Sequence, residues 1–168
     1  MQTLVRRLDA LSEWLGRLVG WATLLMVLIT FAVVLLRYLF DTGWIAMQES
    51  VTYLHAAVFM LGAAYTLKHD GHVRVDILYQ KLSPRARAWV DLLGTLLLLF
   101  PVVGFIFWVS WDYVVESWRV LEGSREAGGL PGVFLLKTLI LLLPLTLALQ
   151  GLALLLKSIM RLREGEDG

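Results

Sequence analysis

The sequence predicts an all-α integral membrane protein with four transmembrane helices. Four mostly apolar stretches contain no Asp, Glu, Lys or Arg: Leu18–Leu36, Ser50–Leu67, Leu92–Trp111 and Thr138–Leu156. A bilayer core of about 30 Å requires about 20 helical residues, and backbone groups in hydrocarbon must bond within their own segment, so each stretch predicts a helix. Composition agrees, since 58% of the 168 residues are hydrophobic and 17% are charged.

We expect one membrane domain over residues 1–168, with spans near 15–36, 50–67, 88–111 and 132–156, because the connections are too short for a soluble domain. The first apolar stretch is longer than that of a signal peptide, and no small-residue cleavage pattern follows it. The formal net charge of +1 does not indicate nucleic-acid binding. The chain has no cysteine, which excludes thiolate metal sites and covalent haem attachment.

The distribution of basic residues predicts that both termini are cytoplasmic. Eleven Lys and Arg residues lie in the two tails and in the connection between the second and third spans: Arg6, Arg7, Arg17, Lys68, Arg74, Lys81, Arg85, Arg87, Lys157, Arg161 and Arg163. Four lie on the opposite side: Arg37, Arg119, Arg125 and Lys137. Cytoplasmic loops carry the excess of Lys and Arg, so the richer side is the cytoplasmic one.

Capping residues and prolines indicate where the third and fourth helices begin and bend. Ser83 followed by Pro84 predicts an N-cap with proline in the first turn, and residues 128–131 (Gly-Gly-Leu-Pro) predict a similar start for the fourth helix. Pro101 and Pro144 fall inside the third and fourth spans and predict kinks there, because proline lacks the backbone donor.

Two flanking segments have amphipathic patterns. A leucine stripe with helical spacing leads into the first span and predicts a short amphipathic N-terminal extension: Leu4, Leu8, Leu11, Leu15 and Leu18. Such a helix either anchors the chain at the membrane surface or docks on a partner subunit. A second, interfacial loop segment is predicted at Ile77–Leu82, with Asp76 as its N-cap.

The spans offer little chemistry. His55 is the one titratable residue within them, and we expect a neutral imidazole bonded to a neighbouring carbonyl; a bis-histidine haem would need a second histidine on a facing helix. Catalytic motifs are absent, so the sequence does not indicate an enzyme. Uncharged polar residues such as Thr30, Thr95 and Gln150 do not make up the polar lining that a substrate path needs. A haem-bearing or redox-enzyme membrane anchor and a self-contained small transporter remain as alternatives.

Charged residues at the membrane edges are more informative. Glu49 precedes the second span and shares a helix face with Tyr53, four residues later. Asp91 lies about one turn inside the third helix, and a carboxylate at such a depth prefers a partner. Glu116 and Arg119 have the spacing of an i, i+3 ion pair.

Several short motifs resemble the small membrane subunit of the tripartite ATP-independent periplasmic (TRAP) transporters, the DctQ-like family. In the first half these are Arg37-Tyr38, Trp44, Gln48-Glu49, Gly62-Ala63-Ala64 and Gly71-His72-Val73-Arg74-Val75-Asp76. In the second half they are Glu122-Gly123-Ser124, Gly128-Gly129-Leu130-Pro131, Leu136-Lys137 and Gln150-Gly151. The resemblance extends from about Leu15 to Lys157.

The resemblance implies a non-catalytic subunit of the bacterial cytoplasmic membrane that scaffolds a large permease subunit. A periplasmic substrate-binding protein would deliver an organic acid, and the coupling ion, sodium, would bind the large subunit; no cofactor is expected on this chain. Contacts with the large subunit or membrane lipids are expected from residues at the helix ends: Arg37, Trp44, Glu49, Tyr53, His72, Arg74, Asp76, Asp91 and Lys137.

Overall fold

The computed structural model describes residues 1–72 and 79–164. Its elements are α1 (Gln2–Phe40), α2 (Ile45–Lys68), α4 (Pro84–Gly94), the π-helical turn η1 (Thr95–Leu99), α5 (Phe100–Arg119) and α6 (Val133–Glu164). Four helical segments are long and apolar enough to cross a membrane, with α4, η1 and α5 forming one of them. The predicted all-α fold with four membrane-spanning helices is confirmed.

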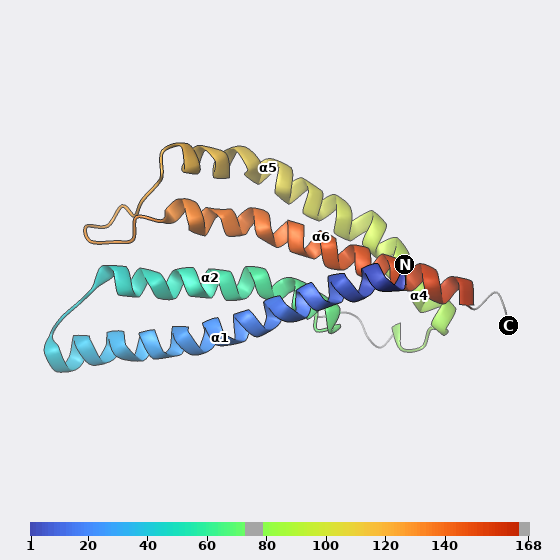
Figure 1. Cartoon of the computed structure of the whole chain (residues 1–168), viewed down its shortest axis with the longest axis horizontal. Coiled ribbons are helices and arrows are strands. Elements are labelled where there is room, and N and C mark those ends of the chain that lie inside the picture. The colour runs from blue at the N-terminus through green and yellow to red at the C-terminus, as the bar shows by residue number, and fades with distance from the viewer. Residues whose placement is uncertain (73–78, 165–168) are drawn as a thin grey trace.

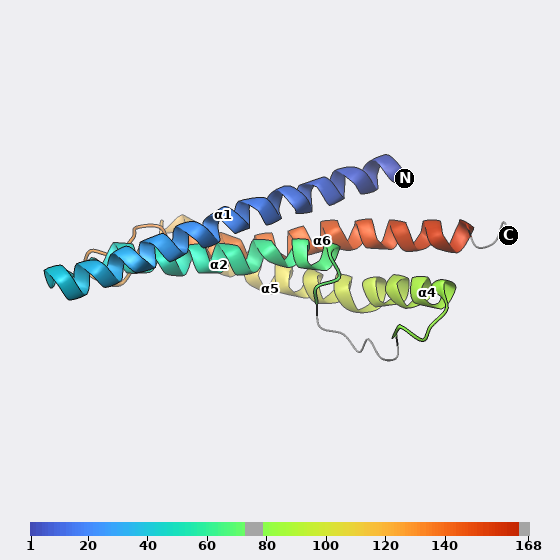
Figure 2. The same ribbon diagram turned by 90° about the horizontal axis from the view of Figure 1, so that it is seen from below.

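The helices form an elongated bundle of two antiparallel pairs, α1 with α2 and α5 with α6 (Figure 1). Helix α6 contacts α1, α2, α4 and α5, so it is the element that joins the two pairs. The start of α1 and the end of α6 lie at one end of the bundle, which we call the terminal end (Figure 2). The α1–α2 turn and the loop between α5 and α6 lie at the other end, which we call the loop end.

The N-terminal extension is the first part of α1 and not a separate helix. At about 1.5 Å per residue, the 39 residues of α1 span about 58 Å, well beyond a bilayer core. Val5, Ser12 and Leu15 are buried, because α6 continues alongside to Glu164. The predicted leucine stripe is therefore divided: Leu15 packs inside the bundle, whereas Leu4, Leu11 and Leu18 are exposed.

The start of the third span agrees with its predicted cap, because the Ser83 side chain accepts a hydrogen bond from the Ala86 N–H at 3.2 Å and Pro84 opens α4. The π-helical turn η1 ends two residues before Pro101, where the sequence predicts a kink. There the Phe100 N–H bonds the Thr95 carbonyl, five residues earlier. Proline at position 101 cannot bond the carbonyl four residues before it, which favours a widened turn.

The fourth span begins at Val133, close to the predicted residue 132, but Pro131 is not in its first turn. The expected place of Pro131 in the first helical turn is therefore wrong. The Leu130 carbonyl accepts from the Ser124 N–H at 2.9 Å, and the Leu130 N–H donates to the distant Glu49 carboxylate, so the backbone here belongs to the loop. Pro144 lies inside α6 as predicted, and the helix continues through it.

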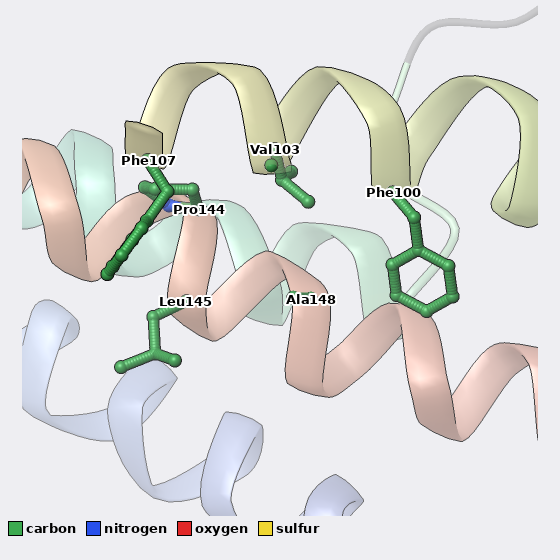
Figure 3. A pocket seen from close by; sticks show the side chains of 7 residues that line it. Phe100, Val103, Phe107, Pro144, Leu145 and Ala148 are labelled. Atoms are coloured by element: carbon green, nitrogen blue, oxygen red, sulfur yellow. The ribbon is translucent and has the colours of Figure 1, made fainter. Parts of the chain in front are cut away.

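Large apolar side chains cover the outside of the bundle, as expected of a surface in contact with lipid. Trp21 and Phe59 are each 72% exposed and Trp108 is 80% exposed. A shallow apolar pocket of about 300 Å³ lies between α5 and α6, beside Pro144 and lined on α5 by Phe100, Val103 and Phe107 (Figure 3).

The predicted interfacial segment at Ile77–Leu82 and its cap Asp76 begin outside the described residues.

Candidate interface sites at the two ends of the bundle

At the loop end, Glu49 holds the loop between α5 and α6 against α2. Its carboxylate accepts hydrogen bonds from the Ser124 hydroxyl and, at 2.6 Å, from the Leu130 N–H. A Cβ on Gly129 would lie 2.8 Å from Glu49 Oε2, so the loop passes close enough to require glycine there. Gly128 has a φ of 79°, a conformation that favours glycine as well. The loop is thus shaped around a carboxylate from the other helix pair.

A second carboxylate joins the two ends of the same loop. Glu122 pairs with Lys137 of α6 and accepts a hydrogen bond from the Ser117 hydroxyl of α5 at 2.7 Å. The hydrogen bonds from Lys137 and Ser117 lower the pKa of Glu122. Lys137 also lies over the Tyr113 ring, with its ammonium 3.9 Å from the centroid. Lys137, a predicted interface residue, is therefore engaged within the chain.

Tyr53 lies one helical turn after Glu49, on the same side of α2. Its hydroxyl is buried and has no hydrogen-bond partner in the part of the chain that the structure describes. A Cβ on Gly132, at the end of the loop, would lie 3.7 Å from the Tyr53 ring. The predicted pair of Glu49 and Tyr53 is thus brought against the loop between α5 and α6.

At the terminal end, α1 is fastened to α6 by a buried polar network. The Ser12 hydroxyl donates to Gln150 Oε1 at 2.7 Å, and Gln150 Nε2 donates to Asp9 Oδ1 at 3.2 Å. Asp9 also pairs with Lys157 at 2.8 Å. Gln150 is 2% exposed, so both ends of its amide are satisfied where water does not reach.

Other terminal-end contacts tie α1 to α2 and fix the start of α4. Glu13 pairs with Lys68 at 2.5 Å and with His69 at 3.1 Å. Asp91 accepts from the Tyr79 hydroxyl at 2.8 and 2.9 Å, which supplies the partner expected for a carboxylate at this depth. At the loop end, the predicted Glu116–Arg119 ion pair is present at 3.1 Å, although it is exposed.

The remaining predicted site residues divide into two groups. Arg37, Trp44 and His72 are exposed at the helix ends, where a partner or lipid could reach them. Arg74 and Asp76 lie outside the described residues.

His55 differs from expectation. Within the described chain its imidazole makes no hydrogen bond to a carbonyl, because it is exposed on the outer face of α2, whose carbonyls bond within the helix. Since it faces away from the neighbouring helices, it is badly placed to ligate a haem held between them.

Sequence reasoning missed the side chains that fasten α1 at the terminal end: Asp9, Ser12, Glu13, Lys68 and Lys157. A signal was available, since Gln150 is the one amide in the uncharged stretches and requires partners from another helix.

Within residues 1–72 and 79–164, no group of three or more His, Cys, Asp or Glu side chains is arranged to hold a metal ion. The polar side chains gathered at the two ends can connect helices to each other and to a loop.

The chain is similar in sequence to known membrane transport proteins. The family model described as "Tripartite ATP-independent periplasmic transporters, DctQ component" matches residues 26–164. A curated relative, the C4-dicarboxylate TRAP transporter small permease protein DctQ of Vibrio cholerae serotype O1, is 32% identical over 89 residues, which is 52% of this chain and 38% of that protein. No solved structure matches the chain significantly. The family match covers most of the chain, which therefore belongs to the DctQ family, a component of the tripartite ATP-independent periplasmic transporters.

Proposed function

We propose that this chain is a non-catalytic scaffold for the large permease subunit of its transporter. On this proposal, a periplasmic binding protein captures an organic acid and the large subunit moves it across the bacterial cytoplasmic membrane together with a coupling ion, sodium. The chain itself binds no substrate, ion or cofactor. Its role is to provide a fixed surface in the lipid bilayer against which the large subunit packs while it transports the organic acid.

The proposal rests on one observation, that polar side chains in the spans form hydrogen bonds within the chain. Gln150, the most deeply buried side-chain amide, is bonded at its oxygen to Ser12 and at its nitrogen to Asp9. Thr30, Thr95 and Thr146 each donate to the carbonyl four residues earlier in their own helix. A substrate path needs polar groups that are free to bind solute near the membrane midplane. Here Gln150 joins two helices, and the three threonines are satisfied within their own helices.

We further propose that the terminal end faces the cytoplasm. It carries Arg6, Arg7 and Arg17 on α1 and Arg161 and Arg163 on α6, in accord with the preference of Lys and Arg for cytoplasmic segments. The loop end would then face the periplasm, where a binding protein approaches. Cysteine substitutions test this orientation directly, because the chain has no cysteine of its own. Labelling from outside sealed cells should reach Arg125→Cys and not Arg163→Cys.

Transport measurements test the scaffold role. The expected result is that cells take up the organic acid when they produce this chain, the large subunit and the binding protein, and that omission of this chain abolishes uptake. Uptake by the large subunit and binding protein at the full rate without this chain would contradict the proposal. As a control, the amount of large subunit in the membrane should be measured in both strains, so that loss of transport is separated from loss of expression.

A further inference from the structure

Two neighbouring polar side chains on α2 face outward inside an apolar span. Thr52 and His55 lie within the uncharged stretch Ser50–Leu67, three residues apart, and both are exposed. By helix geometry His55 is about 9 Å further along the axis than Glu49, at the loop end. An exposed imidazole at this depth would lie against lipid tails, where a polar group without a partner is costly.

The two side chains are also unsatisfied, which distinguishes them from comparable residues. Thr23, Thr30 and Thr66 each donate to the carbonyl four residues earlier, the usual way in which a threonine satisfies its hydroxyl in an apolar helix. Within the described part of the chain, Thr52 makes no such bond and His55 makes no side-chain hydrogen bond at all. The side-chain hydrogen-bonding groups of Thr52 and His55 therefore have no partner within the described part of the chain.

The unsatisfied residues belong to a longer face of α2. Gln48, whose side-chain amide makes no hydrogen bond within the described residues, lies one turn before Thr52, and the spacing continues through Phe59, Gly62 and Thr66. These positions alternate at four and three residues, the 3.5-residue period of a seam between two nearly aligned helices. We call Gln48, Thr52 and His55 the α2 polar stripe.

Beyond Phe59 the same face becomes a groove of about 630 Å³ between α1 and α2. Small residues from both helices line it, namely Gly16, Gly20, Gly62 and Ala63. A Cβ on Gly20 would meet nothing within 4 Å, so Gly20 is not needed for packing within this chain. Small residues let a further helix approach closely in a membrane, and hydrogen bonds between helices then fix its position.

Charge indicates what kind of helix would fit. At its terminal end the groove reaches His72, and the exposed Arg17 follows its lining residue Gly16 on α1. The carboxylate of Glu13, also on α1, is already bonded to Lys68 and His69. A second copy of this chain would bring basic side chains against basic side chains there. A helix that is polar opposite the stripe and acidic at its terminal end complements the whole face.

We propose that the α2 polar stripe and the adjoining groove are the docking surface for a transmembrane helix of the large permease subunit. The proposal rests on the scaffold function above and adds to it the face that is used. The docked helix supplies hydrogen-bond partners to Thr52 and His55, and it lies nearly parallel to α2. The outer face of α5, in contrast, remains in contact with lipid.

Co-purification of the large subunit with tagged variants of this chain in mild detergent tests the docking surface. The double variant Thr52→Val/His55→Leu should retain about tenfold less of the large subunit, by the usual strength of two interhelical hydrogen bonds, and His55→Gln should retain it within about twofold. The matched control is Thr23→Val/Thr30→Val, which removes two exposed hydroxyls that are satisfied within α1 and should not change recovery. Helical circular dichroism of each variant checks that the chain is folded.

Cysteine cross-linking in the membrane gives a second measurement. His55→Cys should cross-link to cysteines placed in the large subunit, and Phe105→Cys, which is 64% exposed on α5, should not. Full recovery of the large subunit with the double variant, or a cross-link from His55→Cys to a second copy of this chain, would overturn the docking proposal alone. If the wild-type chain fails to retain the large subunit at all, the scaffold function is overturned and the docking surface with it.

Discussion

The two ends of the bundle are held together in different ways. At the terminal end, side chains of one helix bind side chains of another, as in Ser12 with Gln150 and Asp9 with Lys157. At the loop end, a helix side chain holds a loop, since Glu49 bonds both a hydroxyl and a backbone N–H of the segment between α5 and α6. The contacts at the terminal end therefore depend on how the side chains of two helices fit each other, whereas the contacts at the loop end depend on the conformation of the loop.

This difference has a consequence for what each end can tolerate. A buried amide with two partners has no water to replace a lost bond, so the terminal end should be sensitive to single changes. The loop end is more exposed, and water can satisfy a released carboxylate or N–H. We therefore expect perturbations of the terminal end to change global stability, and perturbations of the loop end to change local order.

The largest effect should come from Gly16→Leu. A side chain at position 16 would occupy the place of the Tyr65 ring, where α1 crosses α2 near the terminal end. Overpacking of this kind costs about 1 to 3 kcal/mol or more, which should lower the thermal midpoint in detergent by several degrees. Gly20→Leu is the matched control, because its side chain would enter open space. Equal midpoints for the two variants would contradict the packing described here.

Gln150→Leu should have the next largest effect. The change leaves the buried Ser12 hydroxyl without its acceptor and removes one of the bonds to Asp9, a loss of about 1 to 3 kcal/mol. Thermal unfolding in detergent measures it. Gln48→Leu serves as the control, since that amide makes no hydrogen bond within the described chain and its loss should not destabilise the isolated protein. If Gln48→Leu is as damaging as Gln150→Leu, the terminal network is not what fastens α1.

Glu49→Gln should loosen the loop while leaving the bundle intact. The neutral amide is a weaker acceptor than the carboxylate for the Ser124 hydroxyl and the Leu130 N–H. Amide hydrogen exchange should become severalfold faster across residues 123–131, with little change in α1 or α6. Uniformly faster exchange in all helices would show that the loop end contributes to global stability.

A smaller effect concerns pH at the loop end. The pKa of Glu122 is lowered in the folded chain by Lys137 and Ser117, so its contribution to stability is present above the unfolded pKa and is lost as pH falls through the folded one. The local stability of the loop should therefore decrease below about pH 4.3, the ordinary pKa of a glutamate, and Glu122→Gln should flatten this part of the profile. The measurement is the hydrogen-exchange protection of residues 123–131 at each pH, compared between the two proteins.

The helices could be predicted from the sequence more fully than the contacts between them. Uncharged length alone defines four spans, and Ser83 with Pro84 fixes one helix start, because both signals are local. The position of Pro131 outside α6 could not be predicted, since it depends on Glu49, which is 81 residues away from Leu130 in the chain. The outward orientation of His55 likewise depends on how α2 is rotated against α6 and α1. Residue type indicates that such a side chain needs a partner but does not say where the partner lies.

The central claim is that the polar side chains of this chain hold helices together and do not form a path for solute. Reconstitution of the purified chain alone into sealed liposomes tests it most directly, with uptake of labelled organic acid measured under a sodium gradient. The account predicts no uptake above that of empty liposomes, and uptake when the large subunit and the binding protein are added. Saturable uptake by the chain alone that is lost in Gln150→Leu would contradict it.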